Sequence, residues 1–275
     1  MNEPDLETLT PAIVDLAKQA GERVMRVYSR PFEVTQKEDD TPLTEADQAS
    51  NAMIAAGLSR LTPEIPVVSE ENELPTFEQR RQWRLFWLVD PLDGTREFIK
   101  RNDEFTVNIA LVRDGDPVLG VVYAPALDIT YFGYRESGAF KQFDGEQPQR
   151  IQVRRPAERP FQVAVSRSHR KPEIDDIIAR LPDYEAVSVG SSLKFCMVAE
   201  GKVDFYPRIG PTSEWDSGAA QAVVEAAGGR VTDLDMQPLR YNRKESLLNP
   251  DFVVFGDPDH DWSRYLKGIE GTRER

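Results

Sequence analysis

The chain has 275 residues, of which 40% are hydrophobic and 29% charged, and its net charge is −13. This composition is typical of a globular protein with a sizeable core, and it argues against a disordered chain and against polymeric nucleic acid as a partner. The single cysteine, Cys196, excludes an internal disulfide and a zinc site built on spaced cysteines. We expect a cytoplasmic protein with no signal peptide and no transmembrane segment, and loose membrane association stays open.

Two helices are expected first along the chain. Thr10-Pro11 has the pattern of an N-cap followed by proline at the first helical position, and apolar residues then recur at helical spacing as far as Tyr28. A second helix is expected to open at Thr44-Glu45-Ala46-Asp47.

A run of short apolar segments follows these helices. Residues 66–68 and 86–89 are predicted to be buried strands, and each is followed directly by carboxylates. Residues 105–112 and 118–123 form a predicted hairpin, and two further strands are expected at 131–134 and 138–140. The first half is therefore predicted to be two helices on an antiparallel sheet.

The polar stretch 141–159 indicates a boundary between two domains, 1–150 and 151–275. Beyond it, predicted strands alternate with predicted helices, which favours an α/β layer. The expected strands are 162–165, 185–189, 203–206 and 252–255, and the expected helices are 172–180, 192–199 and 217–227.

The string from Asp90 to Thr95, Asp-Pro-Leu-Asp-Gly-Thr, is the most informative feature. We expect a buried strand to end at Asp90, Pro91 to stop the strand pairing, and a tight turn at Asp93-Gly94. Two carboxylates and the Leu92 carbonyl would then lie close together, which is a ligand set suited to Mg²⁺. The alternative is an ordinary Asp-Pro turn at the end of a strand.

Two further acidic strings have competing interpretations. Glu70-Glu71 follows an apolar strand and is either part of a metal site or a solvated strand end. Trp215-Asp216-Ser217 opens a predicted helix, where Asp216 is a metal ligand or an N-cap, two interpretations that are compatible because a helix N-terminus also attracts phosphate.

Taken in order, these three strings resemble the inositol monophosphatase superfamily of metal-dependent, lithium-sensitive phosphatases, from about Leu9 to Gly256. The resemblance implies an α/β (α+β) fold in an αβαβα layered sandwich, with an antiparallel N-terminal and a mixed C-terminal sheet. It also implies two or three Mg²⁺ ions, and water activation by Asp47 and Thr95 with Glu71 as a further catalytic residue. The implied metal ligands are Glu70, Asp90, Leu92, Asp93 and Asp216.

From the residues alone, Asp47 is better explained as part of a helix-opening capping box with Thr44. The chain also departs slightly from the family pattern, since Ser217-Gly218 stands where Thr-Ala is commoner and Asn72 follows the two glutamates. Neither departure removes an implied ligand.

Three more strings resemble the 3′(2′),5′-bisphosphate nucleotidase branch of this superfamily: 166–169, 190–196 and 206–212. The branch implies hydrolysis of adenosine 3′,5′-bisphosphate to AMP and phosphate. Lys194 and the backbone N–H groups after Gly190 offer a binding place for the second phosphate. The expected substrate-binding residues are Glu70, Leu92, Asp93, Gly94, Thr95, Ser168, His169, Gly190, Ser191, Lys194, Arg208 and Asp216.

Several alternatives stay open at this point. The activity could be that of an inositol monophosphatase or a fructose-1,6-bisphosphatase, or the chain could be a non-enzymatic metal-binding regulatory protein. Lys194 could be a solvated helix residue and His169 an exposed strand-end residue. The sequence does not decide between a monomer and a homodimer, or between the bisphosphate and its sulfated precursor.

Overall fold

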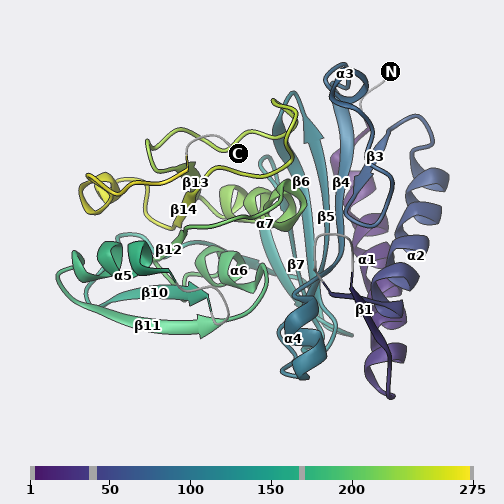
Figure 1. Ribbon diagram of the computed structural model, residues 1–275, viewed down its shortest axis with the longest axis horizontal. Coiled ribbons are helices and arrows are strands. Elements are labelled where there is room, and N and C mark those ends of the chain that lie inside the picture. The colour runs from purple at the N-terminus through teal and green to yellow at the C-terminus, as the bar shows by residue number, and fades with distance from the viewer. Residues whose placement is uncertain (1–3, 37–41, 167–170, 273–275) are drawn as a thin grey trace.

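The computed structural model describes residues 4–36, 42–166 and 171–272. Within them, helices and sheets alternate in five layers, the αβαβα arrangement that the resemblance implies (Figure 1). Helices α1 and α2 form one outer layer, the larger sheet follows, helices α6 and α7 lie in the middle, and the smaller sheet is covered by α5.

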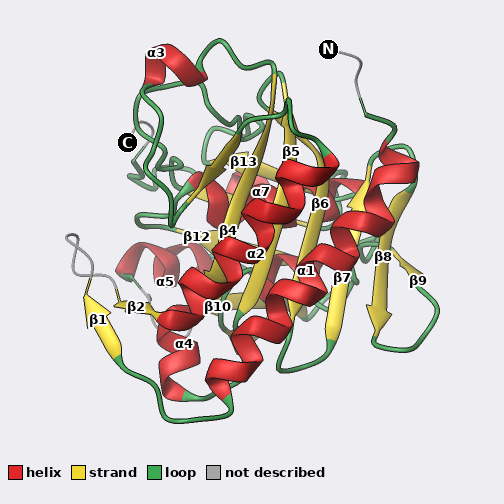
Figure 2. Ribbon diagram, turned by 90° about the vertical axis from the view of Figure 1, so that its right-hand side faces the viewer, coloured by secondary structure: helices red, strands yellow, loops and turns green. Residues whose placement is uncertain are grey.

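The outer helices are α1, Leu6–Tyr28, and α2, Glu45–Leu61 (Figure 2). The prediction that the first helix starts at Thr10-Pro11 is wrong: it begins one turn earlier, because the Asp5 side chain accepts a hydrogen bond from the N–H of Glu7. The helix accommodates Pro11 in its interior. The predicted N-cap of the second helix, Thr44, is confirmed.

The larger sheet has seven strands within the described residues, in the order β3-β4-β5-β6-β7-β8-β9. The expectation of a fully antiparallel sheet is wrong at one edge, where β3 pairs with β4 in parallel. The strands are β3 Val67–Ser69, β4 Leu85–Asp93, β5 Thr106–Arg113, β6 Asp116–Ala124, β7 Ile129–Tyr134, β8 Gly138–Phe143 and β9 Gln149–Ile151. Two short strands, β1 Val34–Gln36 and β2 Pro42–Thr44, pair apart from this sheet.

Strand β4 does not end at Asp90 as predicted. Asp90 pairs with Asn108, and after an irregularity at Pro91 and Leu92 the pairing resumes between Asp93 and Thr106. Proline removes one backbone donor without terminating the strand, so the acidic turn is held at both ends by β5.

The smaller sheet has the order β11-β10-β12-β14-β13 and mixes parallel and antiparallel pairs, as expected. Its strands are β10 Phe161–Ser166, β11 Tyr184–Val189, β12 Phe205–Arg208, β13 Arg230–Asp233 and β14 Phe252–Phe255. The remaining helices are α3 Phe77–Arg80, α4 Thr95–Lys100, α5 Pro172–Ala179, α6 Leu193–Ala199, α7 Glu214–Ala226 and the 3₁₀ helix η1 Trp262–Tyr265.

Helix α7 lies against the larger sheet at unusually short range because β6 carries a glycine there. A Cβ atom on Gly120 would lie 2.0 Å from the backbone oxygen of Ala219. This close approach places the first turn of α7 over the acidic turn of β4, so the fold itself brings residues 90–95 and 214–216 together.

The division into domains 1–150 and 151–275 stays a prediction. Strand β9 ends the larger sheet at Ile151, but the central core packs residues of both halves together, such as Phe86, Val122, Phe195 and Val254. None of the described helices is both long enough and apolar enough to cross a bilayer.

Candidate active site and metal centre

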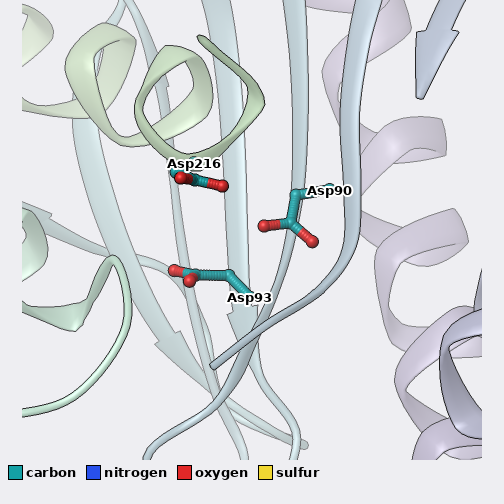
Figure 3. A group of neighbouring side chains, drawn as sticks. All are labelled: Asp90, Asp93 and Asp216. Carbon is teal, nitrogen blue, oxygen red and sulfur yellow. The ribbon is translucent and has the colours of Figure 1, made fainter. Parts of the chain in front are cut away.

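Three carboxylates from two elements converge at one point. Asp90 and Asp93 come from β4 and Asp216 from the first turn of α7, and one oxygen of each lies within 4.8 Å of the others. Figure 3 shows the three side chains pointing toward one another. The structure thus brings together the acidic strings 90–95 and 215–217.

The carboxylates of this cluster are buried close together, which disfavours their charged forms. Burial raises the pKa of Asp90 well above its ordinary value, and the neighbouring Glu70, Asp93 and Asp216 raise it further. Burial also raises the pKa of Asp216 to about 8, with Asp93 and Glu70 adding to the effect. Like charges at this spacing are costly unless a cation lies among them, so the residues present fit a divalent metal.

The backbone of the acidic turn is fixed from two sides. The Leu92 N–H donates to Asp90 Oδ1 at 3.0 Å, and the hydroxyl of Ser50 in α2 donates to the Pro91 carbonyl at 2.7 Å. Gly94 adopts a φ of 90°, and a Cβ there would lie 3.0 Å from the backbone oxygen of Glu104. Glycine is therefore required at this point of the turn.

Asp47 forms the expected capping box and also contacts the acidic turn. Its Oδ2 accepts hydrogen bonds from the N–H and the hydroxyl of Thr44, both at 2.7 Å, which is the expected capping box. Its Oδ1 accepts from the Thr95 hydroxyl at 3.4 Å. Asp47 is buried, and Thr95 opens helix α4 at the edge of the acidic turn.

Asp216 is not the N-cap of its helix. The cap is Ser213, and Asp216 occupies the third helical position, where its Oδ2 accepts from the Ser213 N–H at 2.8 Å. The capping interpretation of Asp216 is therefore wrong by three residues. The same carboxylate also belongs to the cluster with Asp90 and Asp93.

The start of α7 also rests on a buried polar network that the sequence analysis missed. Glu214 accepts a hydrogen bond from the N–H of Asn242, and the side chain of Asn242 accepts one from Arg80 at 2.7 Å. Arg80 is only 2% exposed, and burial raises the pKa of Glu214 to about 7. No sequence pattern marks Arg80, because its partners lie more than 160 residues away.

A cleft of about 520 Å³ opens beside the carboxylates. Most of the expected site residues line it: Glu70, Asp90, Leu92, Asp93, Gly94, Thr95, Gly190, Ser191, Lys194, Arg208 and Asp216. Asp47 reaches it through Thr95, whereas Glu71 is not among the described residues that line it. Ser168 and His169 lie outside the described residues.

The cleft also contains residues that were not among the expected site residues. Ser166, Ser192, Phe195, Tyr206, Pro211, Thr212 and Trp215 lie inside the strings quoted above, which was the available signal. Leu74, Arg96, Glu97, Ser213, Leu248 and Phe252 lie outside them.

The turn at Gly190 differs from what was expected. The N–H of Gly190 donates to Glu104 Oε2 at 2.8 Å, and the N–H of Ser192 donates to Asp93 Oδ2 at 2.5 Å. Both donors are used within the protein, so among the N–H groups after Gly190 that of Ser192 already has a partner. The same contacts tie the turn directly to the acidic cluster.

Lys194 is buried, so its interpretation as a solvated helix residue is wrong. Its Nζ donates to the carbonyls of Ser191 and Val189, at 2.6 and 3.3 Å, and lies 5.4 Å from the centre of the Tyr206 ring. Burial lowers the pKa of Lys194 to about 8, an effect that Asp93 opposes. Lys194 thus supplies positive charge at the edge of the cluster and holds the Gly190 turn in place.

Comparison with known proteins places these features in context. Residues 5–258 match the sequence model of the inositol monophosphatase family. The chain is 50% identical over 244 residues to the 3′(2′),5′-bisphosphate nucleotidase CysQ of Salmonella typhimurium, covering 88% of this chain and 97% of that protein. It is 40% identical over 257 residues to the same-named protein of Haemophilus influenzae, covering 93% and 96%.

Solved structures agree with this picture. The crystal structure of CysQ from Bacteroides thetaiotaomicron superimposes with a TM-score of 0.80 at 40% identity, over 92% of this chain and 99% of that one. The inositol monophosphatase of Thermotoga maritima gives a TM-score of 0.76 at 26% identity, over 94% and 96%.

Proposed function

The chain belongs to the inositol monophosphatase family, and we propose that it is a CysQ-type 3′(2′),5′-bisphosphate nucleotidase that hydrolyses adenosine 3′,5′-bisphosphate to AMP and phosphate. The observation that carries this proposal is the 50% identity to nucleotidases of that name over 88% of the chain, combined with a cleft that contains the converging carboxylates. It is tested by comparing turnover of this bisphosphate with that of inositol 1-phosphate and fructose 1,6-bisphosphate.

We propose that Mg²⁺, as two or three ions, is held by Glu70, Asp90, the Leu92 carbonyl, Asp93 and Asp216. Support comes from the hard oxygen donors, from the short distances among three of them and from the raised pKa values of Asp90 and Asp216. Bound there, the ions would polarise the phosphate, acidify a bound water and stabilise negative charge on the leaving oxygen.

Thr95 and Asp47 are proposed to orient the attacking water. Asp47 Oδ2 accepts from Thr44, and the Thr95 hydroxyl lies 3.4 Å from Asp47 Oδ1 and 3.3 Å from the Leu92 carbonyl. A threonine hydroxyl whose proton is engaged in this way presents its oxygen lone pairs outward, and these can accept a proton from water. Proton transfer from water to Thr95 Oγ1, with the Thr95 proton passing to Asp47, is therefore available without movement of the backbone.

Arg208 and Lys194 are proposed to bind the phosphate that is not cleaved. They are cationic side chains lining the cleft, in a protein whose net charge is −13. Local positive charge is needed there, because the overall field of the protein repels anions. Inositol monophosphatase activity is the second candidate, favoured by the shared carboxylate cluster and the 0.76 TM-score to such an enzyme.

A further inference from the structure

The chain continues beyond the residues that match the family. The match ends at residue 258, and the structure then describes η1 and a segment, residues 268–272, here called the C-terminal segment. The ring of Trp262 in η1 stacks on Phe205 with 4.9 Å between centroids, and Trp262 is fully buried. Residues 259–272 are therefore an integral part of the fold.

The C-terminal segment forms one wall of a cavity of about 590 Å³, whose other walls include residues 233–236. In Figure 1 this end of the chain lies beside β13 and β14. A Cβ atom on Gly271 would lie 2.3 Å from Leu234 Cδ1, so glycine permits the close approach at this point.

Asp251, directly before β14, links the segment to the rest of the protein. The Asp251 N–H donates to the Thr272 carbonyl at 2.9 Å, and the Thr272 N–H donates back to Asp251 Oδ2 at 2.6 Å. The other carboxylate oxygen, Oδ1, accepts the N–H of Gly210 at 2.8 Å. Asp251 is only 2% exposed, so both bonds lie in a shielded environment where they are strong.

From Gly210 the hydrogen bonds continue to the cleft. The Gly210 carbonyl accepts from the Thr212 hydroxyl at 3.2 Å, and Thr212 Oγ1 accepts from Arg208 Nε at 2.7 Å. A second guanidinium nitrogen of Arg208 donates to the Pro211 carbonyl at 3.0 Å. Arg208, Pro211 and Thr212 all line the cleft. The orientation of the Arg208 guanidinium is thus set by a loop that Asp251 holds.

We propose that the C-terminal segment, acting through Asp251, positions Arg208 for binding the phosphate that is not cleaved. The identity of the substrate in this inference rests on the proposed function. The chain of hydrogen bonds from Thr272 to Arg208 does not depend on it. Asp251 is a positioning residue here, since it contacts the loop and not the cleft. Loss of the segment removes both hydrogen bonds between Thr272 and Asp251, which weakens the hold of Asp251 on Gly210.

The test compares three variants of the full-length protein: a stop after Gly268, Asp251→Ala, and both together. The stop leaves Trp262 and Leu266 of the core in place. Glu270→Ala is the matched control, because it also removes one negative charge but from an exposed position in the same segment. For each protein, KM and kcat for adenosine 3′,5′-bisphosphate are measured at saturating Mg²⁺, and hydrogen exchange of peptides covering 207–213 and 217–226 is measured by mass spectrometry.

We expect KM to rise by about five- to tenfold in the stop variant and in Asp251→Ala, the scale of one displaced charge-assisted hydrogen bond, with kcat within about twofold. The combined variant should be no worse than Asp251→Ala, exchange should rise in 207–213 only, and the control should match wild type. Unchanged hydrogen exchange in 207–213 would overturn the inference. A fall in kcat as large as the rise in KM would overturn it too. If exchange rises as expected while the wild-type protein does not cleave the bisphosphate, the positioning of Arg208 stands and the proposed substrate is wrong.

Discussion

The hydroxyl of Thr95 lies 3.4 Å from Oδ1 of Asp47, although the two residues belong to different helices, α4 and α2. This contact connects α2 with the acidic turn, and it links a capping aspartate to Thr95, which lines the cleft. A second hydrogen bond joins α2 to the acidic turn: the Ser50 hydroxyl donates to the Pro91 carbonyl at 2.7 Å.

Replacing either member of this pair should lower kcat much more than it changes KM. We expect Thr95→Ala and Asp47→Asn each to reduce kcat by about 10²-fold or more, because the pair is proposed to move a proton in the transition state and to hold no substrate charge. Thr95→Ser keeps the hydroxyl and is the matched control. The double variant should be no slower than the slower single variant, and additive losses would show that the two residues do not act as one unit.

Removing a charge from the acidic cluster should abolish turnover and yet stabilise the metal-free protein. For Asp90→Asn and Asp93→Asn we expect at least about a hundredfold loss of turnover, or about 3 kcal/mol of transition-state stabilisation. The melting temperature in EDTA should rise, because repulsion among buried carboxylates is relieved. Turnover assays and thermal melts with and without Mg²⁺ measure both effects.

Glu64→Gln is the control for these variants, since Glu64 is exposed and lies outside the cleft-lining residues. Near-native turnover of either cluster variant in Mg²⁺ would refute the assignment of Asp90 and Asp93 as metal ligands.

The metal-free protein should lose stability as the pH rises. The folded-state pKa of Asp216 is about 8, above its ordinary value of 3.8, so the folded state holds a proton that the unfolded chain releases. The stability gained from this proton is present in full below pH 3.8 and is lost as pH rises toward 8. Glu214, with a pKa of about 7, acts in the same direction.

Thermal melts between pH 5 and 8.5 check this dependence. We expect the melting temperature to fall with pH in EDTA and to fall less in Mg²⁺, because bound metal replaces the protons. Binding of Mg²⁺ should also release protons, which calorimetry in buffers of different ionisation enthalpy detects. A melting temperature in EDTA that rises across this range would contradict the prediction.

Local patterns predicted most of the elements, whereas the layered arrangement followed from the family resemblance. Apolar runs identify strands such as β4 and β5, and capping residues identify the start of α2. The parallel pairing of β3 with β4 was missed because it depends on contacts between distant parts of the chain. The N-cap of α7 was placed at Asp216 instead of Ser213 because both residue types are favoured caps. Short elements such as α4 and β13 were missed, because they contain too few residues to show a period.

The cluster of Asp90, Asp93 and Asp216 could be predicted, because the motif and the family resemblance both identify it. The surroundings of Lys194 could not, since they depend on how the turn at Gly190 packs against Glu104 and Asp93. A basic residue on a helix has the same sequence signature whether it is solvated or buried, and only the fold distinguishes the two.

The buried position of Lys194 changes what its substitution should do. Lys194→Met leaves the carbonyls of Val189 and Ser191 without this donor, and we expect the free energy of unfolding to fall by about 1–3 kcal/mol. The specificity constant should fall more for adenosine 3′,5′-bisphosphate than for inositol 1-phosphate, because only the former has a second phosphate. Lys202→Met, an exposed lysine, is the control. An equal fall of the specificity constant for both substrates would show that Lys194 supports the turn and the cluster without binding the second phosphate.

The close approach of α7 to the larger sheet should be intolerant of a methyl group. A Cβ on Gly120 meets the Ala219 carbonyl, so Gly120→Ala must displace the helix that carries Asp216. We expect a destabilisation of about 1–3 kcal/mol and a weaker stabilisation by Mg²⁺. Urea unfolding with and without Mg²⁺ measures both, and unchanged Mg²⁺ stabilisation would show that α7 keeps its place.

The central claim is tested most directly by phosphate release from adenosine 3′,5′-bisphosphate, inositol 1-phosphate and fructose 1,6-bisphosphate, measured side by side in Mg²⁺ and in EDTA. We expect a kcat/KM for adenosine 3′,5′-bisphosphate at least about tenfold above the other two, with no turnover in EDTA. A higher kcat/KM for inositol 1-phosphate would make the chain an inositol monophosphatase, and turnover that survives EDTA would contradict the metal centre at Asp90, Asp93 and Asp216.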